Sequence, residues 1–280
     1  MKKILVPADF SPTAENAMKY AINFAKKFQA EIVFFYSSHI PVITPGIHAE
    51  AYEEMVEKEM INHKNKLEHL TSELCEKAGF EKDSYTSIVG SGFAGDEIPE
   101  IVQKQNCDLI IMGTTGAGGL KKLFGSITYH IIKLSTTPVI AIPDGFPSHV
   151  MPTKIVLATD YKGPIPHMEL LQEISLVNNS DLLIFNVQKE QEYSPSIEEA
   201  IQGLAIEDAV KSVNHSYHFS VDDNVTESIK DFTEKENANL LVIIPHEHDF
   251  FERIFGISTT KELAHSANIP LFIITENTKK

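Results

Sequence analysis

The sequence of 280 residues contains two copies of one unit. The stretch 3–10, a short apolar run that ends in an acid and an aromatic residue, reappears 151 residues later at 154–161. Three later segments recur in the same order: 108–112 resembles 239–244, 124–127 resembles 255–258, and 137–142 resembles 269–274. Similar segments in the same order indicate a duplicated structural unit. We therefore expect two domains, 1–143 and 153–276, joined by a linker at 144–152 that is rich in turn formers.

Apolar runs and helical stretches alternate within the first copy. Ser11 followed by Pro12 is typical of a helix start, and apolar residues then recur at helical spacing as far as Phe28. The run 32–36 is almost entirely apolar, as expected for a strand covered on both faces. Further strands are expected at 85–89, 107–112 and 138–142, and further helices at 49–78, 97–105 and 127–134. The alternation predicts an α/β fold with a parallel sheet and right-handed crossovers.

Composition narrows the classes of function. Hydrophobic residues make up 42% of the chain, which is typical of a globular protein. The net charge of −15 repels nucleic-acid phosphates and anionic lipid, so neither is an expected partner. No apolar run approaches the roughly 20 residues that a membrane span needs. The two cysteines, Cys75 and Cys107, lie in helix-like and strand-like stretches, which favours a reducing compartment and a cytoplasmic protein.

Candidate ligand-binding residues follow the strands, because ligands of parallel α/β sheets bind beyond the carboxyl ends of the strands. The first strand ends in Pro7, Ala8 and Asp9. The fourth runs into 113–119, where four of seven residues are glycine, and Gly125 and Ser126 then open a helix. This pattern predicts a phosphate-binding site. The phosphates would be bound by main-chain amides near a helix start, by the positive end of the helix dipole and by the Ser126 hydroxyl. It is not a Walker loop, since no Gly-Lys-Ser/Thr closes it.

These motifs resemble the universal stress protein family, and two copies in one chain resemble its tandem members. The resemblance covers 1–143 and, more faintly, 152–276. It rests on the acid after the first strand, the Met112-Gly113 pair, the glycine loop that closes on Gly125-Ser126, and the final Pro138-Val139-Ile140 strand. The family's nucleotide signature is Gly-x2-Gly-x9-Gly-Ser/Thr. Here Gly113 and Gly116 fit its first half, but eight residues rather than nine separate Gly116 from Gly125.

The resemblance implies a Rossmann-like fold in each copy, with a five-stranded parallel sheet of order 3-2-1-4-5 and helices on both faces. It also implies pairing of domains, as a homodimer or as an intramolecular pseudo-dimer. The implied cofactor is ATP or AMP, with Mg²⁺ as an optional companion. Asp9 and the backbone near Ser37 would hold the adenosine end. The residues implied for the rest of the cleft are Pro7, Ala8, Met112 and Gly113 along its wall, and Gly116, Gly125, Ser126 and Ile127 at the phosphates.

The second copy keeps the scaffold but not the loop. Asp160 is present, but 163–166 replaces the Ser11-Pro12 start, and 245–251 stands where the first copy has glycines. Proline removes a donor and acids repel phosphate. We expect this copy to bind no nucleotide and to act as the partner half of a pseudo-dimer.

Two other patterns suggest different ligands. The run 90–95 matches G-x-G-x-x-G, but it follows the third strand rather than the first, and Asp108 begins a strand rather than ending one. A glycine turn before a helix explains it better than NAD binding does. His246, His248 and Asp249, and also His215 and His218, suggest a metal, but a third ligand cannot be assigned to either set. We expect exposed histidines and no metal site.

No catalytic constellation emerges, because Ser11 and Ser126 lack a nucleophile-elbow context and neither cysteine has a motif around it. The expected function is that of a stress-response regulatory protein that binds an adenine nucleotide in its N-terminal domain, with hydrolysis absent or slow. The alternatives are a dimerising scaffold or signalling module of the same fold that binds no nucleotide, and a slow ATPase.

Overall fold

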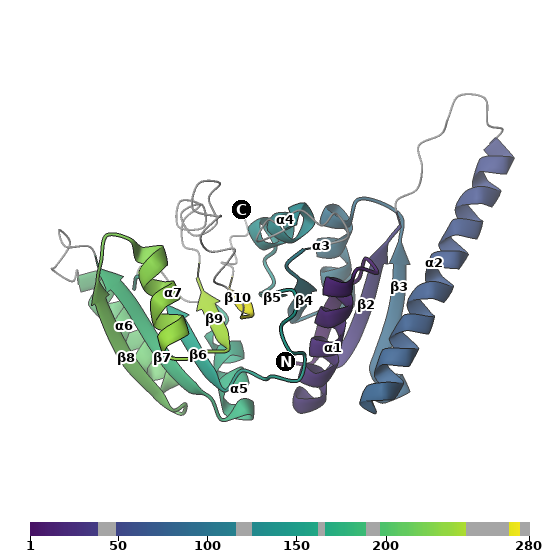
Figure 1. Ribbon diagram of the computed structural model, residues 1–280. Helices are drawn as coiled ribbons and strands as arrows, with labels where there is room; N and C mark the ends of the chain where they lie inside the picture. Colours follow the sequence, from purple (N-terminus) through teal and green to yellow (C-terminus); the bar gives the residue numbers. More distant parts are fainter. Residues whose placement is uncertain (39–48, 116–124, 162–165, 189–196, 245–268, 275–280) are drawn as a thin grey trace.

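The strands described by the computed structural model form one sheet (Figure 1). The described residues are 1–38, 49–115, 125–161, 166–188, 197–244 and 269–274. The order across the sheet is β3-β2-β1-β4-β5-β10-β9-β6-β7-β8. Read from each outer edge toward the middle, each half therefore has the strand order 3-2-1-4-5, and within each half all neighbouring strands are parallel. The expected fold class is confirmed.

The first unit alternates strand and helix from β1 to β5. Its elements are β1 Lys3–Pro7, α1 Pro12–Phe28, β2 Glu31–Ser37, α2 Ala49–Ala78, a 3-10 turn η1 Lys82–Ser84, β3 Tyr85–Gly90, α3 Ala94–Gln105, β4 Leu109–Gly113, α4 Ser126–Leu134 and β5 Val139–Ile142. The Ser11 Oγ accepts a hydrogen bond from the Ala14 N–H at 3.2 Å and so caps α1, as its sequence predicts. Helix α3 begins three residues before the predicted Glu97, because the Phe93 carbonyl already accepts from Asp96 and Glu97.

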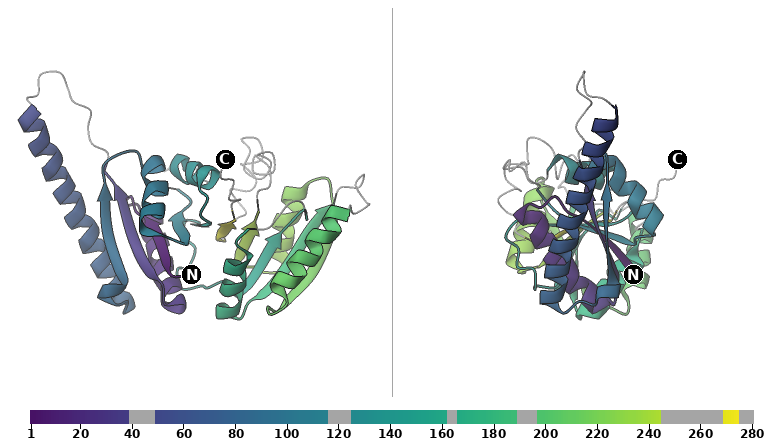
Figure 2. Two further views of the ribbon diagram at one scale, coloured as in Figure 1. Left: turned by 180° about the vertical axis from the view of Figure 1, so that it is seen from behind. Right: turned by 90° about the vertical axis from the view of Figure 1, so that its right-hand side faces the viewer.

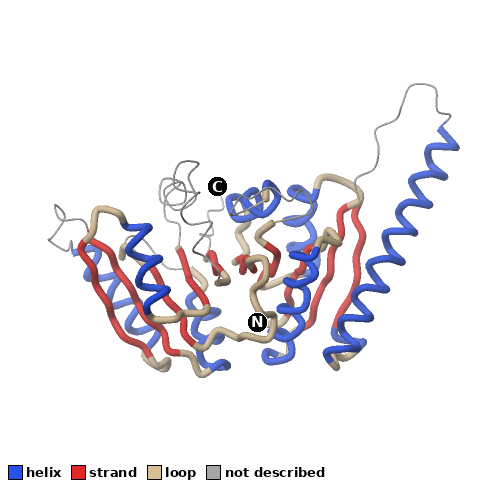
Figure 3. Tube along the Cα trace, viewed as in Figure 1, coloured by secondary structure: helices blue, strands red, loops and turns tan. Residues whose placement is uncertain are grey.

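The second unit repeats this alternation. Its elements are β6 Lys154–Ala158, α5 Met168–Asn178, β7 Asp181–Gln188, α6 Ile197–Val210, β8 His215–Val221, α7 Val225–Lys235, β9 Leu240–Ile243 and β10 Leu271–Ile273. Figure 3 shows the strands of both units side by side as one layer flanked by helices. In the part of the chain that the structure describes, no helix is both long enough and apolar enough to span a bilayer.

The two units meet at their fifth strands. β5 and β10 are the antiparallel pair in the sheet, with Ile140 opposite Phe272. Both strands lie at the edge of their own unit, and their pairing joins the two parallel halves. The sequence predicts that the second copy acts as the partner half of a pseudo-dimer, and β5 and β10 are the strands through which the two units pair.

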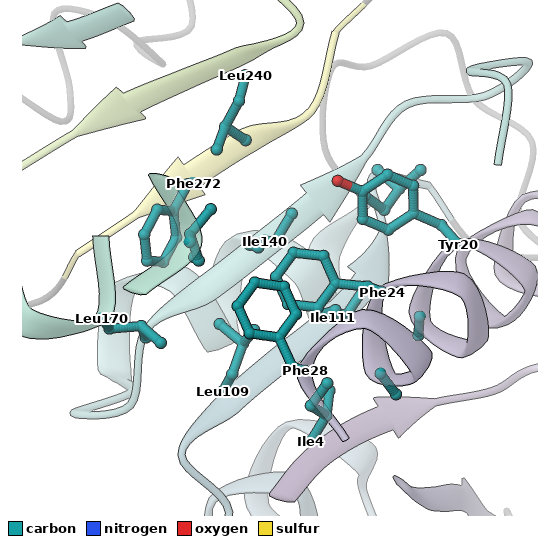
Figure 4. Packing of buried hydrophobic residues seen from close by; sticks show 14 of the residues in the cluster. Ile4, Tyr20, Phe24, Phe28, Leu109, Ile111, Ile140, Leu170, Leu240 and Phe272 are labelled. Carbon is teal, nitrogen blue, oxygen red and sulfur yellow. The ribbon is translucent and has the colours of Figure 1, made fainter. Parts of the chain in front are cut away.

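One apolar core runs across both units on the face that α1, α2, α5 and α6 cover. Figure 4 shows Phe24 and Phe28 of α1 together with Leu170 and Phe272 of the second unit in this core. Phe24 and Phe272 are fully buried. The opposite face carries α3 and α4 in the first unit and α7 in the second. Figure 2 shows the same arrangement from behind and from the side.

The segment between β5 and β6 packs against α1. Phe146 is buried and contacts the Tyr20 ring, with centroids 6.1 Å apart. The side-chain amides of Asn16 and Asn23 donate to the carbonyls of Phe146 and Ser148 at 2.9 and 3.0 Å. The connection is thus fixed to the first unit by apolar and polar contacts.

Candidate functional site

The predicted site residues of β1 lie where that strand ends. Pro7 is its last residue, and Ala8 is buried, with its N–H donating to the Phe35 carbonyl of β2 at 2.8 Å. The Asp9 carboxylate accepts a hydrogen bond from the Ser11 N–H at 3.0 Å. This bond fixes the Asp9 side chain beside the first turn of α1, while Phe10 between them adopts a φ of 60°.

The end of β4 lies against the start of α1. Met112 and Gly113 are the last residues of β4, and both are buried. A Cβ added at Gly113 would stand 2.9 Å from the Thr13 Cγ2 and 3.2 Å from the Thr13 carbonyl oxygen. The Thr115 hydroxyl donates to the Thr13 hydroxyl at 3.4 Å. Glycine is therefore required at 113 by the close approach of two elements, and not by a positive φ.

Helix α4 begins beside the same strand end. The Gly125 N–H donates to the Thr114 carbonyl at 2.7 Å, and the Thr128 hydroxyl donates to the Gly113 carbonyl at 3.0 Å. Gly125 is the N-cap, and no side chain caps the helix. Ser126 and Ile127 are its first two residues, so their amides have no acceptor within the helix. The Gly125 N–H thus already donates to a protein carbonyl, whereas the resemblance implies that Gly125 contacts the phosphates.

Ser37 is the last residue of β2, and its side chain turns toward the β3–α3 connection. Its hydroxyl donates to the Gly92 carbonyl at 2.7 Å, and the neighbouring Ser38 N–H donates to the Gly90 carbonyl at 2.9 Å. The Glu97 carboxylate accepts from the Ser91 N–H at 2.8 Å and occupies the space beside Gly90, where a Cβ would overlap it. The glycines of 90–95 make room for protein groups, in agreement with a structural turn.

Aromatic side chains form a wall next to Asp9 that sequence reasoning missed. The Phe10 and Tyr36 rings lie 4.6 Å apart, and the His63 ring of α2 lies 4.9 Å from Tyr36. The Lys66 ammonium lies 3.9 Å from the centre of the Phe10 ring. Burial and the nearby carboxylates of Asp9 and Glu59 raise the pKa of Tyr36. The aromatic residue directly after the strand-one acid is the signal that could have indicated this wall.

Three strand ends therefore carry the described candidate residues along one edge of the sheet. Adjacent strands β2, β1 and β4 bring Ser37, Asp9 and Gly113 to that edge, and α4 adds Ser126 and Ile127. Close contacts join the end of β1 to the start of α1, α1 to β4, and β4 to α4. Ser37 is bonded to the β3–α3 turn instead. Gly116 lies outside the described residues.

The second unit places different groups at the corresponding strand ends. Tyr161 follows Asp160 with a φ of 57°, close to that of Phe10, and the Thr159 N–H donates to the Phe185 carbonyl as Ala8 does to Phe35. Helix α5 begins only at Met168, with His167 in the left-handed region as its N-cap. The stretch 245–251, which replaces the glycine loop, lies outside the described residues, and so do residues 162–165 of the connection before α5.

Of the histidines considered as metal ligands, one pair has separate hydrogen-bond partners and the other pair lies outside the described residues. His215 and His218 of β8 have different partners: the Nε2 of His215 lies 3.1 Å from the Glu207 carboxylate, and His218 lies 2.8 Å from the Ser216 hydroxyl. Between residues 1 and 274, excluding the undescribed gaps, no cluster of three or more His, Cys, Asp or Glu is placed to hold a metal. His246, His248 and Asp249 lie outside the described residues.

Comparison with known proteins gives the same family for both halves. The model of the universal stress protein family matches residues 1–143 and 154–275. Two proteins of Methanocaldococcus jannaschii, universal stress proteins MJ0531 and MJ0577, are each 33% identical to this chain, over 144 and 157 residues. Each match covers 50% of this chain, and 81% and 94% of the relative.

A solved structure extends the likeness of fold over the whole chain. The crystal structure of a universal stress protein from Archaeoglobus fulgidus superimposes with a TM-score of 0.71 at 18% identity. The match covers 99% of this chain and 97% of that one. At this identity the likeness concerns the fold alone, and it includes both units.

Proposed function

The chain belongs to the universal stress protein family, and from this premise we propose that its N-terminal unit binds an adenine nucleotide, ATP or AMP. The single observation that carries the proposal is the start of α4, which is bonded to the end of β4 and left without a side-chain cap. A helix start of this kind attracts an anion through its free amides and its dipole. The buried glycine beside it, Gly113, lets the first turn of α1 approach the same strand end at Thr13.

Charge gives the nucleotide a direction along the sheet edge. Asp9 lies at the end of β1, and its carboxylate, together with that of Glu59, contributes to the raised pKa of Tyr36. A phosphate beside these carboxylates would be repelled, whereas the same phosphate at Ser126 and Ile127 would meet amide donors. We therefore orient the adenosine end toward Asp9 and the backbone of Ser37, and the phosphates toward α4. The aromatic pair Phe10 and Tyr36 lies on the adenosine side.

The remaining parts of the proposal follow from the sequence. Mg²⁺ would enter with the phosphates of ATP, because this ion is usually bound through substrate phosphates together with one or two carboxylates. Residues 153–276 would carry no nucleotide and would complete the sheet. We propose a regulatory receptor in which hydrolysis is absent or slow. We also propose a cytoplasmic protein, since its two cysteines are buried free thiols.

The rival function is that of a scaffold of the same fold that binds no nucleotide. It is favoured by the hydrogen bond from the Gly125 N–H to the Thr114 carbonyl, because this amide is then not available to a phosphate. Thermal unfolding in the presence of ATP, AMP or GTP distinguishes the two, because a ligand that binds only the folded chain raises the melting temperature. The nucleotide proposal predicts a rise with ATP or AMP that saturates and exceeds that with GTP. No rise with either adenine nucleotide would favour the scaffold.

Two variants at one position separate the amide from the hydroxyl. Proline is tolerated at the first position of a helix, and Gly125 has a ψ of 161° that suits a following proline. Ser126→Pro removes the amide donor and the hydroxyl, whereas Ser126→Ala removes only the hydroxyl. We expect Ser126→Pro to weaken ATP binding about tenfold or more and Ser126→Ala to weaken it less. Equal, unchanged affinities would contradict a phosphate at this helix start.

A further inference from the structure

The outer edge of the second unit is a strand with which no other strand of the described residues pairs on its outer side. β8 is the last strand of the sheet and pairs with β7 residue for residue from His215 to Val221 without a bulge. The Leu182 N–H donates to the Asn214 carbonyl, and the Asp222 N–H donates to the Gln188 carbonyl. In a parallel pair alternate residues bond to the neighbour, so the backbone groups of 215, 217, 219 and 221 point away from the sheet.

Large apolar side chains are exposed along this edge. Phe219 and Val221 of β8 are 65% and 51% exposed, and Leu204 of α6 is 72% exposed. The Tyr217 hydroxyl donates to the Glu207 carboxylate at 2.7 Å, which fixes one side of α6 beside β8. Leu204 lies one helical turn before Glu207 and so on that same side. Exposed apolar groups that gather at one place mark an interaction surface.

The sequence of β8 has none of the features that protect a free edge. Natural edge strands carry lysine, proline, a bulge or an inward-pointing charge. The seven residues His215–Val221 include no Lys, Pro, Asp or Glu, and their register is regular. At the opposite edge, Tyr85 and Val89 of β3 pack against the core that α2 covers, and no large hydrophobic residue of β3 is among the exposed ones. The two edges of the sheet therefore differ.

We propose that β8 is the contact for a second copy of this chain, paired antiparallel about a twofold axis at His218. The sheet already joins its own two units through antiparallel edge strands, β5 and β10, and β8 would continue it in the same way. In this arrangement Tyr217 of one copy lies opposite Phe219 of the other. His215 of one copy likewise lies opposite Val221 of the other. These pairs use all four outward-facing residues on both strands.

Charge favours this surface for self-association. The chain carries a net charge of −15, so two copies repel each other over most contacts. β8 has no Asp, Glu, Lys or Arg, and in the proposed register the next residue, Asp222, lies opposite Asn214 of the second copy rather than an acid. Added salt screens the general repulsion and leaves the apolar contact, so the dimer should tighten as ionic strength rises.

Sedimentation of the full chain over a range of concentrations tests the proposal. The wild type should reach twice its monomer mass of 31.2 kDa. Phe219→Lys should raise the dissociation constant of the dimer about tenfold or more, because a charge would face the apolar pair. Phe219 is exposed, so its melting curve should stay near that of the wild type. Thr86→Lys, at an exposed position on the β3 edge, is the matched control and should leave the dimer intact.

Cysteine cross-linking tests the register. Residues directly opposite in a non-hydrogen-bonded antiparallel pair have Cα atoms about 4.5 Å apart, within disulfide range. His218→Cys should therefore form a covalent dimer under mild oxidation. Ser216→Cys alone and Ser220→Cys alone should not, whereas their equimolar mixture should. The native Cys75 and Cys107 are buried.

Several results would overturn the proposal. One is a wild type that stays monomeric at every concentration, as it would if another segment or another protein covers β8. A dimer that survives Phe219→Lys, or one that Thr86→Lys dissociates, would place the contact elsewhere. A dimer that weakens as salt rises would indicate attraction between charges. Cross-linking of Ser216→Cys alone would contradict the register.

Discussion

Gly113 and Thr13 come so close that a Cβ at position 113 would stand 2.9 Å from the Thr13 Cγ2. This contact places the end of β4 against the first turn of α1. Because α4 is bonded to the residue after Gly113, three elements meet there. The proposed nucleotide site depends on this meeting point.

Gly113→Ala should therefore destabilise the protein. The added methyl group overlaps Thr13, and overpacking of this kind costs about 1–3 kcal/mol. Gly203 of α6 is the matched control, because a Cβ there meets nothing within 4 Å. Gly203→Ala should stabilise the chain by about 0.5–1 kcal/mol, since alanine favours a helix. Urea unfolding followed by circular dichroism measures both changes. A stable Gly113→Ala variant would show that the close approach is not maintained in solution.

Ser126→Asp should move stability and binding in opposite directions. An acid in the first turn of α4 interacts favourably with the helix dipole and adds about 0.3–1 kcal/mol to stability. The same carboxylate would repel a phosphate at the helix start, so the affinity for ATP should fall about tenfold or more. Thermal melting and calorimetric titration give the two quantities. Unchanged ATP affinity in this variant would locate the phosphates elsewhere.

Phe272→Ala should lower the free energy of unfolding of both units together rather than that of the second unit alone. Phe272 is fully buried opposite Ile140 of the first unit, and loss of such a ring costs about 3–5 kcal/mol. The common core also links α1 and α5, where the Lys27 ammonium donates to the Asn178 side chain at 3.0 Å. Urea unfolding should keep a single transition that shifts as one. Two transitions, of which only one moves, would show that the units unfold independently.

The two cysteines should react slowly in the folded protein. Burial raises the pKa of Cys75 and of Cys107 to about 12. The thiolate is the reactive form, so at pH 8 only about one part in ten thousand would be ionised. Alkylation with iodoacetamide should be slow at neutral pH and should rise with pH toward that pKa, and it should become fast in urea. Rapid labelling of the native chain would contradict this burial.

The sequence predicted the scaffold well because the strands are continuous apolar runs. The strand that begins at Glu31 and the helix from Ala49 to Ala78 lie within a residue of the predicted positions. The start of α3 was predicted too late, since Gly95 suggested a turn. In the structure Gly95 is buried in the helix, where a Cβ would meet Phe93 and His130. Sequence alone does not report how closely two helices approach.

The candidate site was predicted in its positions but not in its contacts. Asp9 and Gly113 were recognisable because they follow strands. The Gly125 N–H donates to the Thr114 carbonyl, and this hydrogen bond joins the end of one element to the start of another. No local sequence pattern predicts such a contact. The Phe10 and Tyr36 contact likewise joins two strand ends that lie far apart in the sequence. The β5–β10 pair depends on which free edges meet in the folded chain.

Calorimetric titration of the full chain with ATP, compared with the Ser126→Asp variant, tests the central claim most directly. We expect one nucleotide per wild-type chain and a loss of that binding in the variant, because the N-terminal unit presents the uncapped start of α4 next to Gly113, whereas 245–251 of the second copy contains no glycine. Two nucleotides per chain, or one that the variant binds equally well, would contradict the account.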